Sequence, residues 1–386
     1  MAPTIWLSAD ALGYPEGGGH CWVYLNWALG LRSLGCHVIW LEGIEPDVPT
    51  DEMHTNIAKM KSHLAHYGLE DCLALYSKGA EPLPAAVSET CLDFGRAAEA
   101  DLLLNLCYSV TADVLRPFRK TALIDIDPGL LQIWLSEEQV ETPRHDLYFS
   151  IGETVGRPDA LFSSAGLEWH YTPPCVALDW WPVHPTSPDA RFTTVTHWCA
   201  YTGWISHGAE SYHNDKRCGF LPYFDLPRYT RQPLELALCL GANENLQLEP
   251  EAEQECADLR ARGWHVRHAY SVASTPASYQ AYIQSSRGEF SCAKPSCVRL
   301  QNAWISDRTL CSLASGKPAV VEHTGPSSFL PDADGLFRFR DVGQAVRALA
   351  AVGADYELHS RQARALAEEF FDAKKVVQRV LERALN

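Results

Sequence analysis

Residues 4–42, TIWLSADALGYPEGGGHCWVYLNWALGLRSLGCHVIWLE, decide the fold. The stretch begins with a short apolar run, Thr4–Ala9, and ends with a second one, Cys36–Glu42. Between them lie a glycine-rich loop and a run from about His20 to Leu34 that has the pattern of a helix. Apolar strands that alternate with helices in this way are typical of a parallel sheet covered on both faces.

The same alternation recurs along the chain, with further strands predicted at Leu102–Leu106, Thr121–Ile126 and Leu147–Ile151 and a helix around Ser88–Glu99. A Pro- and Trp-rich segment, Tyr171–Pro188, interrupts it, because proline resists both helix and sheet interiors. Strands and helices restart at Phe192 and include a strand predicted at Ala319–Glu322. A helix is predicted from about Tyr356 to Leu385. We therefore expect an α/β protein with two tandem Rossmann-like, doubly wound domains, residues 1–175 and 190–360, and a C-terminal helical tail, residues 361–386.

Composition and charge exclude several classes of protein. The 386 residues include 32 Lys+Arg and 48 Asp+Glu, a net charge of -16 that repels phosphate backbones, so nucleic acid is not an expected partner. The 13 cysteines form no C-x-x-C, which favours buried thiols over a zinc site. No signal peptide and no apolar run of ~18 residues is visible, so we expect a cytoplasmic protein without stable membrane insertion. The oligomeric state is left open.

The glycine-rich loop Gly13–His20 provides the first candidate site. Its glycines allow close approach to the backbone, and the helix that follows directs free N–H groups into the same space. The spacing is not G-x-G-x-x-G, because Trp22 stands three residues after Gly19, and this disfavours a nicotinamide dehydrogenase. His20 lies at the carboxyl end of the first strand, where an imidazole can act as a general base. Tight packing for the glycines and helix capping for His20 are the alternatives.

A second candidate follows the strand Thr121–Ile126. Asp127 is placed at the same edge of the sheet as His20, where a carboxylate can orient an imidazole, and Asp125 is the competing candidate. One turn further on, Gln132 can hydrogen-bond a polar acceptor molecule. The letters of Asp125-Ile126-Asp127 match D-x-D, but they end a hydrophobic strand, so no metal site is expected. A plain helix cap at Asp127 is the alternative.

The second half offers positions that can hold phosphate, each after a predicted strand or at the start of a helix: Lys216, Lys294, Ser306 with Arg308, and Thr324 with Gly325. The carboxyl ends of parallel strands meet at one edge of the sheet, and backbone N–H groups at a helix start bind anions. Convergence on one edge is the reason to consider these positions together. A solvated charged face and plain capping are the alternatives.

Over nearly its whole length the chain resembles the GT-B glycosyltransferases, most clearly in residues 13–43 and in residues 306–339, SDRTLCSLASGKPAVVEHTGPSSFLPDADGLFRF. The resemblance implies a cleft between the two domains and a C-terminal helix that returns to the first domain. It also implies a nucleotide-diphosphate sugar on the second domain and an acceptor at Gly18 and Gly19. One departure is Gly325-Pro326-Ser327-Ser328, where the family has G-x-x-E.

The resemblance further implies chemistry for several residues. The pair His20 and Asp127 resembles the base dyad of inverting members, and Lys216 resembles the basic residue that meets the diphosphate, joined here by Lys294 and the helix start near Ser306. The resulting prediction is a metal-independent hexosyltransferase of class EC 2.4 that needs no cofactor. It would transfer a sugar to a small-molecule acceptor in natural-product or glycoconjugate biosynthesis. A sugar-nucleotide epimerase of the same fold and a non-catalytic sugar-nucleotide-binding protein are the alternatives.

Overall fold

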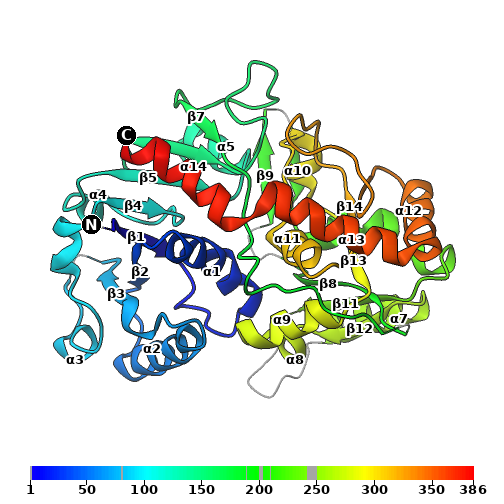
Figure 1. Cartoon of the computed structure of the whole chain (residues 1–386), viewed down its shortest axis with the longest axis horizontal. Helices are drawn as coiled ribbons and strands as arrows, with labels where there is room; N and C mark the ends of the chain where they lie inside the picture. The colour runs from blue at the N-terminus through cyan, green and yellow to red at the C-terminus, as the bar shows by residue number, and fades with distance from the viewer. Residues whose placement is uncertain (1, 80, 188, 200–202, 209, 241–249) are drawn as a thin grey trace. The chain divides into compact units, whose positions relative to one another are not determined.

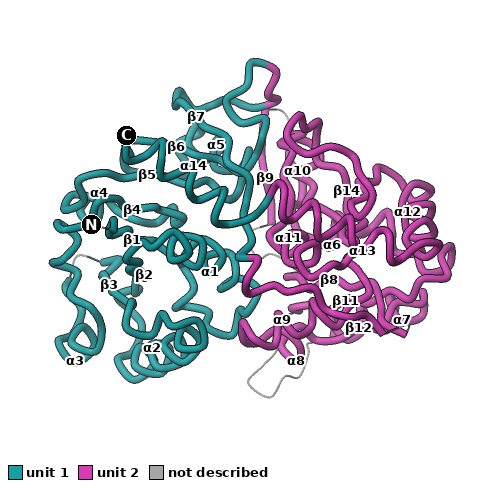
Figure 2. The backbone as a smooth tube through the Cα atoms, viewed as in Figure 1, with its two compact units in different colours: residues 1–158, 162–177, 371–386 teal, residues 159–161, 178–370 magenta. Residues whose placement is uncertain are grey.

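The structure is a computed structural model that describes residues 2–79, 81–187, 189–199, 203–208, 210–240 and 250–386. It divides into two compact units, each of which is described by itself (Figure 2). Unit 1 comprises Met1–Pro158, Phe162–Ala177 and Phe371–Asn386, and unit 2 comprises Asp159–Leu161 and Leu178–Phe370.

Unit 1 is built on a sheet of seven parallel strands in the order β3-β2-β1-β4-β5-β6-β7. The strands are β1 Thr4–Ala9, β2 His37–Ile44, β3 Leu73–Ser77, β4 Leu102–Asn105, β5 Thr121–Asp125, β6 Leu147–Ser150 and β7 Trp169–Tyr171. The order reverses between β1 and β4, and ligands of such sheets bind at the carboxyl ends of the strands at this switch point. The five strands predicted in this half are confirmed, and β3 and β7 are additional.

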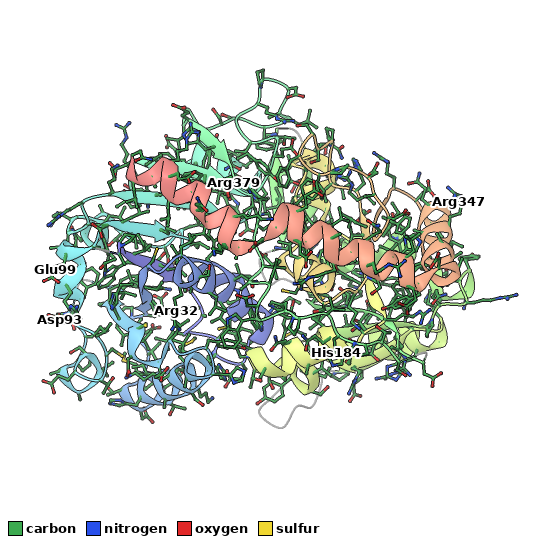
Figure 3. The ribbon with its side chains drawn as sticks, viewed as in Figure 1. Arg32, Asp93, Glu99, His184, Arg347 and Arg379 are labelled. Carbon is green, nitrogen blue, oxygen red and sulfur yellow. The ribbon has the colours of Figure 1, made fainter. Side chains whose placement is uncertain are left out.

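The helices of unit 1 are α1 Gly18–Ser33, α2 Thr50–Ala65, α3 Ala85–Ser88, α4 Ala112–Leu115, α5 Leu130–Ser136 and α14 Ala373–Leu385. Helix α14 lies against α1 (Figure 1), where a Cβ atom on Gly30 would come within 3.0 Å of the Cβ of Ala373. Glycine therefore allows the two helices to approach closely. In the last turn of α1, Arg32 (labelled in Figure 3) donates to the carbonyl oxygens of Tyr67 and Gly68 at 2.7 and 2.8 Å.

The predicted helix around Ser88–Glu99 is wrong. Helix α3 ends at Ser88, and a separate 3₁₀ helix covers Phe94–Glu99. The carboxylate of Asp93 accepts the N–H of Gly95 at 2.9 Å, a cap that starts the second helix and separates it from the first.

Unit 2 is built on six parallel strands in the order β12-β11-β8-β13-β14-β15. The strands are β8 Phe192–His197, β11 Leu234–Cys239, β12 His265–His268, β13 Gly288–Ser291, β14 Ala319–Glu322 and β15 Leu336–Phe339. The switch point lies between β8 and β13. An antiparallel hairpin of β9, Trp204–His207, and β10, Glu210–His213, stands apart from this sheet. The doubly wound α/β architecture is confirmed in both units.

The helices of unit 2 are α6 Lys216–Phe220, α7 Pro250–Ala261, α8 Tyr270–Ala273, α9 Pro276–Ser285, α10 Pro295–Leu300, α11 Asp307–Ala314, α12 Val342–Ala354 and α13 Tyr356–Leu366. Aromatic side chains fill the core on one side of the sheet, where the rings of Phe290 and Phe339 stack at 5.3 Å between centroids. No helix in the described ranges is both long and apolar enough to cross a membrane.

The single helix predicted from Tyr356 to Leu385 is also wrong. Helix α13 passes into one π-helical turn, Ala367–Phe371, and α14 then starts afresh with the carboxylate of Asp372 capping its first turn. The backbone of Val176 pairs with this break: its N–H donates to Phe371 at 2.8 Å, and its carbonyl accepts from Ala373 at 2.9 Å. Two of the places where the chain crosses the boundary of unit 1, after Ala177 and before Phe371, therefore lie side by side within that unit.

Candidate functional site

The strongest candidate site is the carboxyl edge of the sheet in unit 2, at its switch point. Lys216 is the first residue of α6 and is buried. Its Nζ atom donates to the carbonyl oxygen of Cys292, just beyond β13, at 2.7 Å. Gly219 makes this possible, because a Cβ atom there would overlap the carbonyl oxygen of Ala293. The missing side chain of one glycine thus seats α6 against the loop that follows β13.

The environment of Lys216 holds little negative charge: its ammonium group acts on the carboxylate of Glu322, whose pKa it lowers, but no ion pair joins the two side chains among the described residues. Burial, together with the positive charges of Arg308 and Lys294, lowers the pKa of the Lys216 ammonium group to about 8. The ring of Trp304 lies beneath Nζ, with its centroid at 5.5 Å. Among the described residues, the carbonyl of Cys292 is the hydrogen-bond partner of Nζ, so two of its three donors are available to an anion.

The guanidinium group of Arg308 uses its hydrogen-bond donors on other groups of the protein. Its Nε atom pairs with the carboxylate of Glu289 at 2.8 Å, Nη1 donates to the carbonyl of Val195 at 2.8 Å, and Nη2 donates to the hydroxyl of Ser291 at 2.6 Å. Arg308 therefore ties β8 to β13 across the switch point and contributes its charge beside Lys216.

Two loops meet beside this site with unusual backbone conformations. Gln301 and Ala303 have positive φ angles of 49° and 56°, and Gly325 has a φ angle of 140°. The N–H of Ala303 donates to the carbonyl of Thr324 at 3.0 Å, and the hydroxyl of Thr324 donates to the carbonyl of Trp304 at 2.5 Å. Left-handed conformations cost about 1 kcal/mol or more for residues other than glycine and cluster at functional sites.

Lys294 and Ser306 complete this edge. Lys294 is half-buried at the N-cap position of α10, close enough to Lys216 to lower its pKa. Ser306 is the N-cap of α11, as predicted, but its side chain makes no capping hydrogen bond. The structure thus brings Lys216, Lys294 and Arg308 within electrostatic range of one another, with the loop of Thr324 and Gly325 beside Trp304.

In unit 1 the predicted residues gather at the start of α1. Gly18 is the first residue of the helix and is buried, Gly19 is half-buried, and His20 is exposed. The Nε2 atom of His20 lies 2.7 Å from the carbonyl oxygen of Asp10, the first residue after β1. The ring of Tyr24 packs edge-on against the imidazole at 5.2 Å. His20 is therefore held at the switch point with one ring nitrogen engaged.

Asp127 lies at the same edge but not beside His20. It follows β5, and β4 lies between β5 and β1, so two strand spacings, roughly 10 Å, separate their strands. Within the described ranges no hydrogen bond or ion pair joins the two side chains. The base dyad expected from the sequence is therefore not assembled by direct contact here.

Asp125 and Gln132 belong to a buried network instead. The carboxylate of Asp125 accepts from the hydroxyl of Ser150 at 2.7 Å, from Nε2 of Gln132 at 2.8 Å and from the hydroxyl of Tyr108 at 3.2 Å. Burial raises its pKa to about 6. The side-chain oxygen of Gln132 also accepts the N–H of Gly129 at 2.6 Å, so both ends of this amide hold the loop after β5.

One buried carboxylate at this edge was not among the predicted residues. Glu42, on β2, accepts from the N–H groups of Ala11 and Leu12 and from the indole of Trp40. Burial raises its pKa to about 7. A carboxylate inside a strand that is apolar on both faces was the available signal, since such groups are rarely buried without partners. In the part of the chain that the structure describes, no group of three or more His, Cys, Asp or Glu side chains could hold a metal ion.

Comparison with known proteins identifies the fold through similar solved structures. No protein-family model and no curated protein sequence matches the chain. Among solved structures, Anabaena HepE in complex with UDP and glucose is similar with a TM-score of 0.58 and 14% identity, covering 99% of each chain. An alpha-glucosyltransferase in complex with UDP and DNA has a TM-score of 0.60 and 11% identity, covering 100% of each chain. Sucrose-phosphate synthase from Thermosynechococcus elongatus has a TM-score of 0.53 and 13% identity, covering 99% of this chain and 98% of that one. The likeness shows that the chain has the GT-B fold.

Proposed function

We propose that the protein is a metal-independent glycosyltransferase that moves a hexosyl group from a nucleotide-diphosphate sugar to a small-molecule acceptor. The observation that carries the proposal is the buried, sparsely bonded ammonium group of Lys216 at the switch point of unit 2. No carboxylate among the described residues forms an ion pair with Lys216, and a diphosphate would supply that partner. Complexes of the similar structures with UDP support the same reading, and the net charge of -16 favours a small acceptor over nucleic acid.

In this proposal the donor is held by unit 2. Lys216 and Lys294 neutralise the charge that develops on the leaving diphosphate, which is the main form of catalysis available to such a site. The start of α11 at Ser306 and the backbone around Thr324 and Gly325 provide further hydrogen-bonding groups. Arg308 raises the local positive charge while it holds the strands in place.

The acceptor is proposed to enter near Gly18 and Gly19, with His20 as the general base that removes the proton of its hydroxyl or amine group. Asp127 is proposed as a polar group at the same edge that contacts the acceptor. We assign His20 and Asp127 to one acceptor site because the strands that precede them, β1 and β5, end at the same edge of the sheet.

The proposal is tested by measuring binding of UDP, GDP, ADP, CDP and dTDP by calorimetry in the presence of EDTA, with the nucleoside monophosphates as controls. We expect one nucleobase to be preferred and its diphosphate to bind at least ~10-fold more tightly than its monophosphate, because the second phosphate meets Lys216. Incubation of the matching sugar nucleotide without acceptor should leave the sugar unchanged, whereas an epimerase would convert it. The absence of binding to every diphosphate would contradict the proposal.

A further inference from the structure

The peptide group between Asp10 and Ala11 holds His20 from one side. The carbonyl oxygen of Asp10 lies 2.7 Å from Nε2 of the imidazole. A carbonyl oxygen only accepts hydrogen bonds, so Nε2 must carry the proton. In the neutral ring the lone pair then resides on Nδ1, the nitrogen that is left to accept a proton.

The other side of the same peptide group is held by Glu42. The N–H of Ala11 donates to the carboxylate, with its nitrogen 3.0 Å from Oε2 and 3.2 Å from Oε1. A trans peptide is planar, and its C=O and N–H groups point in opposite directions. One rigid plane therefore links the carboxylate of Glu42 to the imidazole of His20 through two hydrogen bonds.

Glu42 is well placed to fix this plane. It is fully buried on β2 and stands in register with Ala9, the last residue of β1. It also accepts the N–H of Leu12 at 3.2 Å and the indole N–H of Trp40 at 2.8 Å. Above its pKa of about 7 Glu42 is ionised, and hydrogen bonds to an ionised acceptor are roughly twice as strong as those between neutral groups. The carboxylate then anchors the start of the glycine-rich loop.

The side chain of Asp10 is used elsewhere. Its carboxylate pairs with Nζ of Lys78 at 3.1 Å, and Lys78 also pairs with Glu45 at 2.9 Å. The contact of Asp10 with the imidazole is therefore made by its backbone alone. This excludes a direct carboxylate–imidazole pair at this position and leaves Glu42 as the charged group in line with the ring.

We propose that Glu42 is a positioning residue for His20: acting through the peptide group of Asp10 and Ala11, it fixes the proton on Nε2 and leaves Nδ1 as the proton acceptor. Chains of hydrogen bonds polarise one another, so the carboxylate also strengthens the contact with the ring. In this proposal Glu42 orients the imidazole of His20, which is the role that the sequence pattern predicted for Asp127. The tautomer of His20 follows from geometry alone, whereas its use in catalysis rests on the proposed function.

The test is ¹⁵N NMR of protein labelled in the histidine rings, at pH 9, where an ordinary imidazole is neutral. His20→Gln identifies the resonances of His20 by their loss. Wild-type protein should show His20 with the proton on Nε2. In Glu42→Gln the amide NH₂ faces backbone donors, so the peptide group is released and both tautomers should be populated. Trp40→Phe, which removes another donor from the same carboxylate, is the matched control and should keep the Nε2–H form.

Two results would overturn the proposal: a proton on Nδ1 in the wild-type protein, or an unchanged tautomer in folded Glu42→Gln. If Glu42→Gln does not fold, the wild-type tautomer decides alone. With a working transferase assay, Glu42→Gln should lower kcat by ~10-fold to ~100-fold, within the contribution of general-base catalysis. Its affinity for UDP should stay the same. Failure to find any transfer would count against the proposed function and leave the NMR result standing.

Discussion

Replacing Lys216 with Met should make the ligand-free protein more stable. The fall in pKa from 10.5 to about 8 corresponds to a cost of about 3 kcal/mol for holding the charged form at pH 7. The variant also loses the charge-assisted hydrogen bond to the carbonyl of Cys292, which contributes about 2 kcal/mol. The net gain is therefore about 1 kcal/mol, or ~2 to 4 °C in the Tm of a unit of this size.

The same variant should lose its response to a nucleoside diphosphate. A ligand at 100 times its Kd stabilises the wild-type protein by about 2.7 kcal/mol, and most of this should vanish with the ammonium group. Urea unfolding of both proteins, with and without UDP or whichever diphosphate binds, measures both effects in one experiment. Stability of the free protein and stabilisation by the ligand should change in opposite directions.

Lys317→Met is the matched control. Lys317 is also fully buried, and burial lowers its pKa to about 8. Its Nζ atom, however, donates to the carbonyl of His184 (labelled in Figure 3) at 2.8 Å and to the hydroxyl of Thr186 at 2.5 Å, near the start of β14 and away from its carboxyl end. We expect Lys317→Met to be less stable than the wild type and to respond normally to the ligand.

The reasoning would be refuted if Lys216→Met lost more than about 1 kcal/mol of stability without ligand, because the ammonium group would then be a structural contact. A wild-type response to the diphosphate in Lys216→Met would refute the assignment of the site. Calorimetric titration of the variant with the diphosphate separates these two outcomes, since it reports binding without unfolding.

Three further predictions follow from the geometry. Between pH 8 and 10.5 the unfolded chain holds a proton that native Lys216 has lost, so stability should rise with pH while diphosphate affinity falls; urea unfolding and calorimetry across this range check both. Gly219→Ala should cost about 2 kcal/mol or more and weaken diphosphate binding, because its Cβ atom would overlap the backbone at Ala293, whereas Gly13→Ala, with nothing within 4 Å, should change neither quantity. His20→Ala should lower kcat by ~10²-fold to ~10⁴-fold with unchanged diphosphate affinity, and unchanged turnover would remove its role as the base.

The sequence predicts the strands of both sheets well where an apolar run is bounded by glycine or a helix. Thr4–Ala9 and Ala319–Glu322 match β1 and β14 in every residue. The hairpin β9–β10 was missed because its residues, WISH and ESYH, are polar and lack an apolar pattern. The break before α14 was missed because helical periodicity continues through it. It is a long-range effect, since the backbone of Val176 replaces hydrogen bonds within the helix.

The candidate site was predictable to a similar degree. Placing Lys216 at a position that follows the first strand of the second unit, and Lys294 just beyond β13, required only the alternation of strands and helices. The order of the strands in the sheet could not be predicted from this alternation. Because β4 lies between β1 and β5, Asp127 is separated from His20. The bond between His20 and Asp10 uses a backbone carbonyl, which no side-chain pattern reveals. The sequence pattern shows Glu42 only as the last residue of an apolar strand and gives no sign of its contact with the N–H groups of Ala11 and Leu12.

The backbone pairing of Val176 with Phe371 and Ala373 has a consequence for synthesis on the ribosome. Unit 1 includes residues on both sides of unit 2 in the chain, and α14, which packs on α1, is made after the whole of Leu178–Phe370. Domains generally fold as units while the chain emerges. Unit 2 therefore has all its residues before unit 1 does, although unit 1 starts first. Until α14 arrives, the face of α1 around Gly30 is uncovered, and a nascent chain stalled before residue 371 would display it to chaperones.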